Sequence, residues 1–217
     1  KIGEKLAREA LLAVFFSILF MAIYICGRFE HRWIASAIMA GALSGAVYVA
    51  YIMGVSIKVM IIIAAVLSIV ISYLLRFNYS IGAMVALIHD ITITLGAVLV
   101  TDIEISIPLV AALLTIIGYS LNDTIIVYDR IRENLRTSLK SDFANVINRS
   151  VNQTLSRTLL TAGTTILALI ILYFLGGAII KDFCFVLIVG LFVGTYSSVY
   201  IASPVLLYLK RDRISKM

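Results

Sequence analysis

The sequence has few charged residues, few prolines and few cysteines. Only 14% of its 217 residues are charged and 62% are hydrophobic, whereas an ordinary soluble domain has about 25% and about 45–50%. This imbalance excludes a water-soluble globule, and the high hydrophobicity also excludes a disordered chain. The two cysteines, Cys26 and Cys184, lie inside apolar stretches, which predicts small buried side chains and neither a disulfide nor a metal site.

What the sequence has instead is a series of long apolar runs. A helix that crosses a bilayer needs about 20 apolar residues, and the length allows about seven. The sequence therefore predicts an all-α, polytopic transmembrane helix bundle that forms a single domain over residues 1–217. The predicted spans are Ala10–Gly27, Ile34–Met53, Lys58–Leu75, Ser80–Val100, Ile105–Tyr128, Thr158–Leu175 and Phe183–Leu209.

The two prolines occupy different places in these spans. Pro108 falls in the first turn of its helix, where a missing backbone N–H is tolerated. Pro204 lies near the end of the last and longest span, where we expect it to kink the helix. Because the chain begins with Lys1 and not Met, we also expect it to be a piece of a longer protein.

The net charge is +6, and the basic residues cluster between the apolar runs. No basic stripe alternates with aromatic residues, so nucleic acid is not an expected partner. If the spans alternate in direction, most basic residues fall on one side, which is then cytoplasmic together with the C-terminus. These residues are Arg28, Arg32, Arg76, Arg130, Arg132, Arg136, Lys140, Arg149, Lys210, Arg211, Arg213 and Lys216.

One connection, residues 129–157, is long and polar. Phe143, Val146, Ile147, Val151 and Leu155 recur in it at helical spacing, which predicts a cytoplasmic amphipathic helix on the membrane surface. The alternative is a solvated linker in which the spacing is accidental.

Ionisable residues at membrane depth indicate a functional site, because each costs roughly 3 kcal/mol to insert. Asp90 lies near the middle of its predicted span, directly after His89. Asp123 and Arg157 lie on adjacent spans at similar depth and could pair. An apolar environment favours the neutral carboxyl and a nearby guanidinium favours the charged one. This predicts a proton path, with a static ion pair as the alternative.

Other polar and small residues have supporting roles in this hypothesis. Hydroxyl and amide groups near Asp123 could hold water or bond its carboxylate; they are Tyr119, Ser120, Asn122 and Thr124. Small residues predict close helix packing, and they are Gly41, Gly45, Gly163, Gly190 and Gly194.

These motifs carry a family resemblance. The run from Gly118 to Asn134, GYSLNDTIIVYDRIREN, closely resembles the signature of the SecF branch of the SecD/SecF family of protein-export membrane proteins. Supporting matches are KLAREA from Lys5, ALIHD from Ala86 and SRTLLT from Ser156. The partner SecD carries a different motif in place of YSLND, so the resemblance is to the C-terminal transmembrane part of SecF.

The resemblance implies a fold of the RND superfamily in a multi-pass protein of the bacterial inner membrane. It implies a subunit without enzymatic chemistry or cofactor, which uses protons as coupling ion and membrane lipid as surroundings. The implied partners are SecD, the SecYEG channel and a preprotein delivered by SecA, which is moved with the proton-motive force. Family knowledge gives proton-relay roles to Asp123 and Arg157, and SecD supplies a further membrane Asp.

The sequence departs from the family pattern in two ways. The family's first helix and periplasmic domain would precede Lys1. The family also joins its Arg-Phe-Glu turn directly to the His-Asp helix, whereas here residues 30–75 intervene, which predicts an inserted helix pair. An echo flanks this segment, because Arg28-Phe29 and Arg76-Phe77 each follow an apolar run.

Two other functions remain compatible with the residues alone. One is a different RND-type, proton-coupled exporter of small or lipidic molecules, which would use similar carboxylates. The other is a structural membrane subunit that only scaffolds a complex.

Overall fold

The fold is helical throughout the part of the chain that the computed structural model describes, which is residues 2–30, 33–54, 57–137 and 142–214. Within these residues there is no strand. The all-α prediction is therefore confirmed. The chain divides into two compact units, residues 1–84 and 85–217.

The first unit contains three helices and the start of a fourth. They are α1 (Ile2–Glu30), α2 (Trp33–Ile52), α3 (Ile57–Leu74) and the first residues of α4 (Asn78–Val100). Leu19, Met39 and Phe77 belong to one buried apolar cluster, with Cys26 and Leu43. The buried hydroxyl of Ser80 adds a bond to the Ala22 carbonyl of α1 at 3.4 Å.

The repeated Arg-Phe pair takes two different conformations. Arg28 and Phe29 lie in the last turn of α1, whereas Arg76 and Phe77 follow the end of α3. Arg76 has a left-handed backbone, with φ of 61°, and the Phe77 N–H bonds the Ser72 carbonyl at 2.8 Å. This arrangement closes α3 and buries Phe77 completely.

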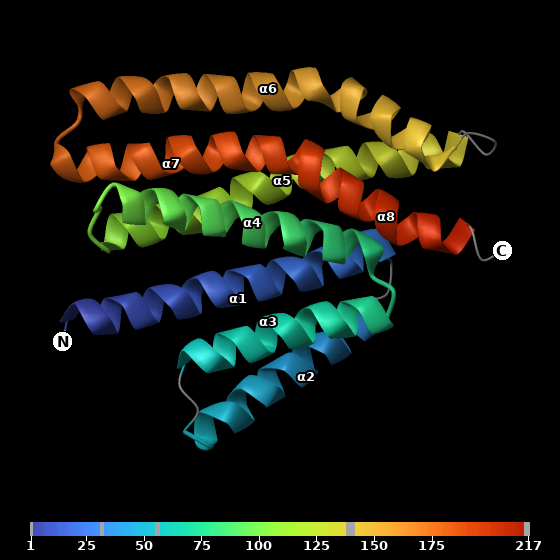
Figure 1. Ribbon diagram of the computed structural model, residues 1–217, viewed down its shortest axis with the longest axis horizontal. Helices are drawn as coiled ribbons and strands as arrows, with labels where there is room; N and C mark the ends of the chain where they lie inside the picture. Colours follow the sequence, from blue (N-terminus) through green and yellow to red (C-terminus); the bar gives the residue numbers. More distant parts are fainter. Residues whose placement is uncertain (1, 31–32, 55–56, 138–141, 215–217) are drawn as a thin grey trace. The chain divides into compact units, whose positions relative to one another are not determined.

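The second unit contains the rest of α4 and the helices that follow it. These are α5 (Ile107–Thr137), α6 (Phe143–Leu175), α7 (Ala178–Ser197), the π-helical segment η1 (Ser198–Ala202) and α8 (Ser203–Ile214). Helices α5, α6 and α7 pack against one another in all three pairs, and Figure 1 shows them side by side. Pro108 is the second residue of α5, as predicted, and the Ser106 hydroxyl accepts the Leu109 N–H at 3.4 Å.

The last predicted span is interrupted close to Pro204. Because Pro204 has no N–H to donate to the Tyr200 carbonyl, the helix widens into η1 directly before it. Figure 1 shows α8 leaving the line of α7 after this point, so the predicted kink is confirmed.

The connection at 129–157 differs from the prediction. It is not a separate helix: α5 continues to Thr137, α6 begins at Phe143, and residues 138–141 lie outside the described residues. Phe143, Val146 and Ile147 are buried inside the protein. The apolar spacing therefore reflects packing between two extended helices.

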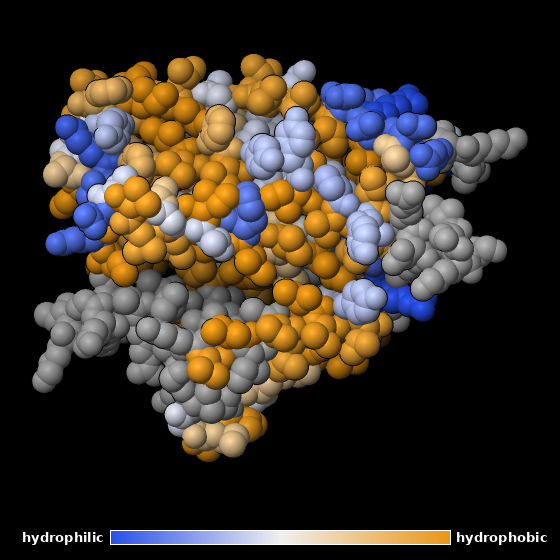
Figure 2. All heavy atoms as spheres, in the orientation of Figure 1, coloured by the Kyte–Doolittle hydropathy of each residue, from blue (hydrophilic) through white to orange (hydrophobic). Residues whose placement is uncertain are grey.

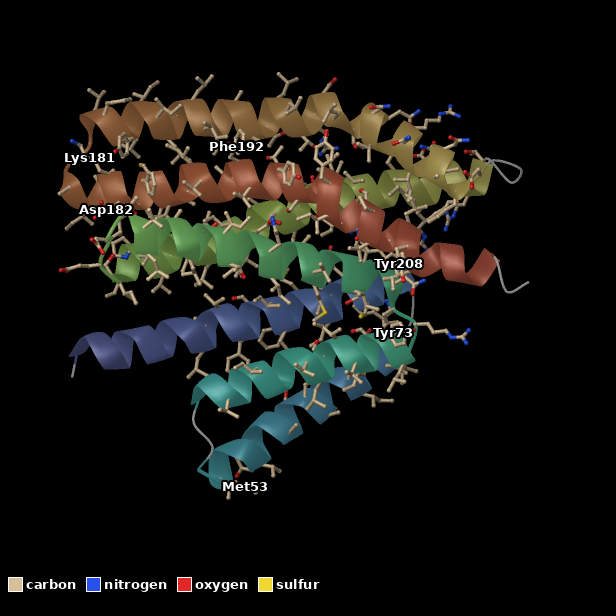
Figure 3. All side chains as sticks on the ribbon, viewed as in Figure 1. Met53, Tyr73, Lys181, Asp182, Phe192 and Tyr208 are labelled. Atoms are coloured by element: carbon tan, nitrogen blue, oxygen red, sulfur yellow. The ribbon has the colours of Figure 1, made fainter. Side chains whose placement is uncertain are left out.

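Five helices in the described part of the chain are long and apolar enough to cross a membrane. The predicted number of seven is not confirmed; the described residues of α2 give a shorter apolar stretch, Ser36–Ala46. In the second unit, Figure 2 shows an apolar band along α6 and α7 with hydrophilic residues toward the helix ends. Lys181 and Asp182 lie at one end of α7, and Tyr208 lies on α8 beyond the other (Figure 3).

Candidate functional site

Asp90 is a buried and well-bonded polar group of the second unit. Its side chain is 1% exposed, and its Oδ2 accepts hydrogen bonds from Ser120 Oγ at 2.5 Å and Ser197 Oγ at 2.7 Å. The Nδ1 of His89 lies 3.0 Å from Oδ1. One carboxylate on α4 thus joins α5 and α7.

Glycines on α7 allow its backbone to pack closely against α5. A Cβ at Gly190 would overlap the Ile116 side chain, and one at Gly194 would lie 3.1 Å from Ser120 Cβ. The predicted close packing at both glycines is therefore present. At Gly41, Gly45 and Gly163, by contrast, a Cβ would meet no described atom within 4 Å, so the described contacts do not require glycine there.

Asp123 lies one turn beyond Ser120 on α5 and is 6% exposed. Two groups act on its carboxylate: the Thr195 side chain of α7 and, electrostatically, the Arg157 guanidinium of α6. The contact with Thr195 is looser than a hydrogen bond, because the buried Thr195 Oγ1 has no partner among the described residues. The buried Thr158 Oγ1, directly after Arg157, also has none there.

The charge of Arg157 acts on the Asp123 carboxylate, but the two side chains do not form an ion pair. Neither belongs to an ion pair within the described residues, although the Arg157 charge reaches the carboxylate. The structure thus brings together the two predicted relay residues in a separated state, and it does not contain the tight pair that the sequence allowed.

A polar pocket of about 320 Å³ lies between α5 and α6 beside Arg157. Its wall begins at Ile126, one turn after Asp123, and continues through Asp129, Arg130, Glu133, Gln153 and Thr154. Arg130 is held by Gln153 and Glu133, each at 2.7 Å. Arg157 therefore borders a space large enough for several water molecules.

The predicted supporting residues divide into two groups. Ser120 is buried on Asp90, and Thr124 is buried, whereas Asn122 is exposed and Tyr119 is half-buried. Among the described residues, none of these four bonds Asp123. The sequence reasoning missed Thr195 and Ser197; their signal was the polar continuation of the Gly190-x-x-x-Gly194 pattern. No group of three His, Cys, Asp or Glu side chains in the described residues could hold a metal ion.

Comparisons with known proteins identify the family of the chain. The family described as "Protein export membrane protein SecD/SecF, C-terminal" matches residues 1–70 and 52–212. The two matches overlap, and each contains one of the Arg-Phe pairs. Whether residues 30–75 are an insertion stays a prediction.

Individual relatives match a little under two thirds of this chain. Protein translocase subunit SecF of Desulfurispirillum indicum is 49% identical over 134 residues, which are 60% of this chain and 43% of that protein. Subunit SecDF of Thermus thermophilus is 40% identical over 64% of this chain and 19% of its own length. A crystal structure of SecDF in a super-membrane-facing form superposes with a TM-score of 0.64 at 40% identity, covering 74% of this chain and 22% of that one.

The chain spans less than half the length of the SecF relatives that it matches. The match with the family nevertheless extends over nearly all of its residues, and its helices are long and apolar enough to cross a membrane. The chain therefore belongs to the SecD/SecF family of protein-export membrane proteins, and it is a multi-pass membrane protein.

Proposed function

We propose that the chain is the membrane-embedded part of a SecF subunit, which works with SecD to promote protein export by means of the proton gradient. The observation that carries this proposal is the buried Asp123 facing a separated Arg157, in a chain related to translocase subunits. The further proposed partners are the SecYEG channel and a preprotein delivered by SecA. Protons are the proposed coupling ion, and no cofactor takes part.

The separation of Asp123 and Arg157 suggests how a proton is coupled to movement. When Asp123 is charged, it attracts the guanidinium of Arg157, which stays protonated at any physiological pH. A proton on the carboxyl removes this attraction, and Arg157 then withdraws toward the polar pocket that it borders. The unpartnered hydroxyls of Thr158 and Thr195 are suitable anchors for water that carries the proton.

The proposed location is the bacterial inner membrane, with the α5–α6 connection and the C-terminus in the cytoplasm. This orientation follows from the basic residues of the connection and the tail, which are retained on the cytoplasmic side. The Lys181 and Asp182 end of α7 then faces the periplasm.

Replacing Asp123 tests the proposal directly. D123N keeps the size of the side chain and removes its titratable group. In the full-length protein with SecD, we expect it to abolish the part of preprotein translocation that depends on the proton-motive force. The measurement uses inverted membrane vesicles with and without an uncoupler. D102N is the matched control, because Asp102 is exposed at a turn with φ of 51°, which asparagine also adopts.

Unchanged export in D123N at full expression contradicts the proposal and favours a structural subunit. Proton-coupled efflux of a dye or lipid by the purified complex, lost in D123N, favours a small-molecule exporter instead.

A further inference from the structure

The Asp90 clamp, defined as Asp90 of α4 with Ser120 of α5 and Ser197 of α7, is the feature that the proposed proton relay leaves unused. Both hydroxyls donate to the same oxygen, Oδ2. All three side chains are almost completely buried. Because hydrogen bonds to a charged acceptor in an apolar surrounding are strong, this point fixes three helices relative to one another.

The clamp residues of α5 and α7 each lie close in sequence to a residue of the proposed relay site. Ser120 is one helical turn before Asp123 on α5, and Ser197 is two residues after Thr195 on α7. Gly194 brings the α7 backbone against Ser120. The register that the clamp imposes between α5 and α7 is therefore also the register that places Thr195 beside Asp123.

The clamp also marks the start of the π-helical segment. Ser197 is the last residue of α7, and η1 begins at Ser198. At the other end of η1, the Tyr128 hydroxyl of α5 donates to the Ala202 carbonyl at 3.1 Å. A π-helical turn within an α-helix is frequent at functional sites and is a common place for a helix to kink. Asp90 of α4 therefore holds the residue before η1, and Tyr128 of α5 holds its last residue.

We propose that Asp90 is a positioning residue: through Ser120 and Ser197 it holds η1 and Thr195 in place against α5, and it does not itself carry the proton. This inference rests on the proposed function, because the group that Asp90 positions is the Asp123 relay. It assigns a role to the His-Asp pair of α4, in which His89 contacts only the other oxygen, Oδ1.

Asparagine and alanine at position 90 separate positioning from proton transfer. The Asn carboxamide oxygen accepts two hydrogen bonds, so D90N keeps both hydroxyls bonded but has no titratable carboxyl. D90A removes the acceptor and leaves two buried hydroxyls unpaired. In the full-length protein with SecD, we expect D90N to retain export driven by the proton-motive force. We expect D90A to lose about tenfold, as for removal of one or two charge-assisted bonds.

Two neighbouring serines provide a matched pair of further variants. S197A removes one donor of the clamp. S198A removes an equally buried hydroxyl that donates only to its own helix, to the Thr195 carbonyl at 2.9 Å. We expect S197A to behave like D90A and S198A to behave like the parent protein. Thermal stability and expression of each variant show that it is folded.

A distance measurement tests positioning without reference to activity. Spin labels at exposed positions 136 on α5 and 208 on α8 report the direction of the chain after η1, in a background where Cys26 and Cys184 are alanine. EPR spectroscopy should give one narrow distance distribution in the parent, D90N and S198A, and a broader or shifted one in D90A and S197A.

The outcomes separate the two proposals. D123N should abolish coupled export and keep the parent distance distribution. If D90N loses as much export as D90A, the carboxyl itself transfers protons and the positioning role is wrong. If D90A and S197A keep the parent distribution, the clamp does not position η1 and the inference is overturned, whatever D123N does.

Discussion

At the scale of single residues, one close contact between α5 and α7 depends on the missing side chain of a glycine. Gly190 lies against the buried Ile116, where a Cβ would overlap the Ile116 side chain. Gly163 of α6 is also a glycine inside a helix, but a Cβ there would meet no described atom within 4 Å. The two positions therefore differ in packing and not in helix propensity.

Alanine at these two glycines should have opposite effects. We expect G190A to reduce stability by about 1–3 kcal/mol, the usual cost of overpacking. G163A should be neutral or slightly stabilising, because alanine favours a helix by about 1 kcal/mol. Thermal unfolding of the purified protein in detergent gives both values. A smaller side chain at Ile116 should rescue G190A, and equal effects of the two variants would contradict the packing argument.

The residues that could be predicted from the sequence are those that violate the apolar background. Asp90, Asp123 and Arg157 are conspicuous because charge is rare at membrane depth. Thr195 and Ser197 could not be identified in the same way, since hydroxyl groups are inexpensive in a helix and bond their own backbone. Only the approach of α7 to α5, which Gly190 and Gly194 permit, shows which hydroxyls reach a carboxylate.

At the scale of elements, the helical extensions beyond the membrane are held together by a polar network. Asn134 of α5 is buried and donates to Ser150 Oγ and to Gln153 Oε1 of α6, each at 2.8 Å. Gln153 also accepts from Arg130. The network joins α5 to α6 beside the apolar residues Phe143, Val146 and Ile147, which are buried in the protein.

Removal of the Asn134 amide should weaken this extension. N134A leaves the buried Ser150 and Gln153 with fewer partners, which we expect to cost about 1–3 kcal/mol. N148A, at an exposed position of α6, is the control and should change stability by less than about 0.5 kcal/mol. Thermal unfolding measures both. An unchanged midpoint in N134A would show that apolar packing of Phe143 and Val146 alone holds the extension.

Helix boundaries beyond the membrane were the least predictable feature of the elements. The apolar run that ends at Tyr128 predicts the membrane part of α5, but the next nine residues are polar except for Ile131 and Leu135 and do not continue the apolar run. Their helical structure depends on contacts with α6, which are non-local. The helical spacing of Phe143, Val146 and Ile147 correctly predicted which face of α6 is covered. It could not show whether lipid or protein covers that face.

At the scale of the whole molecule, the charges at the two ends of the second unit fix the proposed orientation. The segment 129–156 carries five basic residues, namely Arg130, Arg132, Arg136, Lys140 and Arg149. The turn between α6 and α7 is followed by Lys181 and Asp182, which balance each other. The bias therefore favours cytoplasmic retention of the connection.

Cysteine labelling in intact cells tests this orientation. In a full-length protein with Cys26 and Cys184 replaced by alanine, we expect a cysteine at the exposed position 182 to react with a membrane-impermeant maleimide added outside. A cysteine at the exposed position 136 should react only after the cells are permeabilised. Position 136 lies in the α5 extension and position 182 at the start of α7, on opposite sides of the apolar band (Figures 1 and 2). Labelling of position 136 in intact cells, with position 182 protected, would reverse the orientation. The polar pocket beside Arg157 would then lie toward the periplasmic side, and Arg157 would withdraw toward that side when Asp123 takes up a proton.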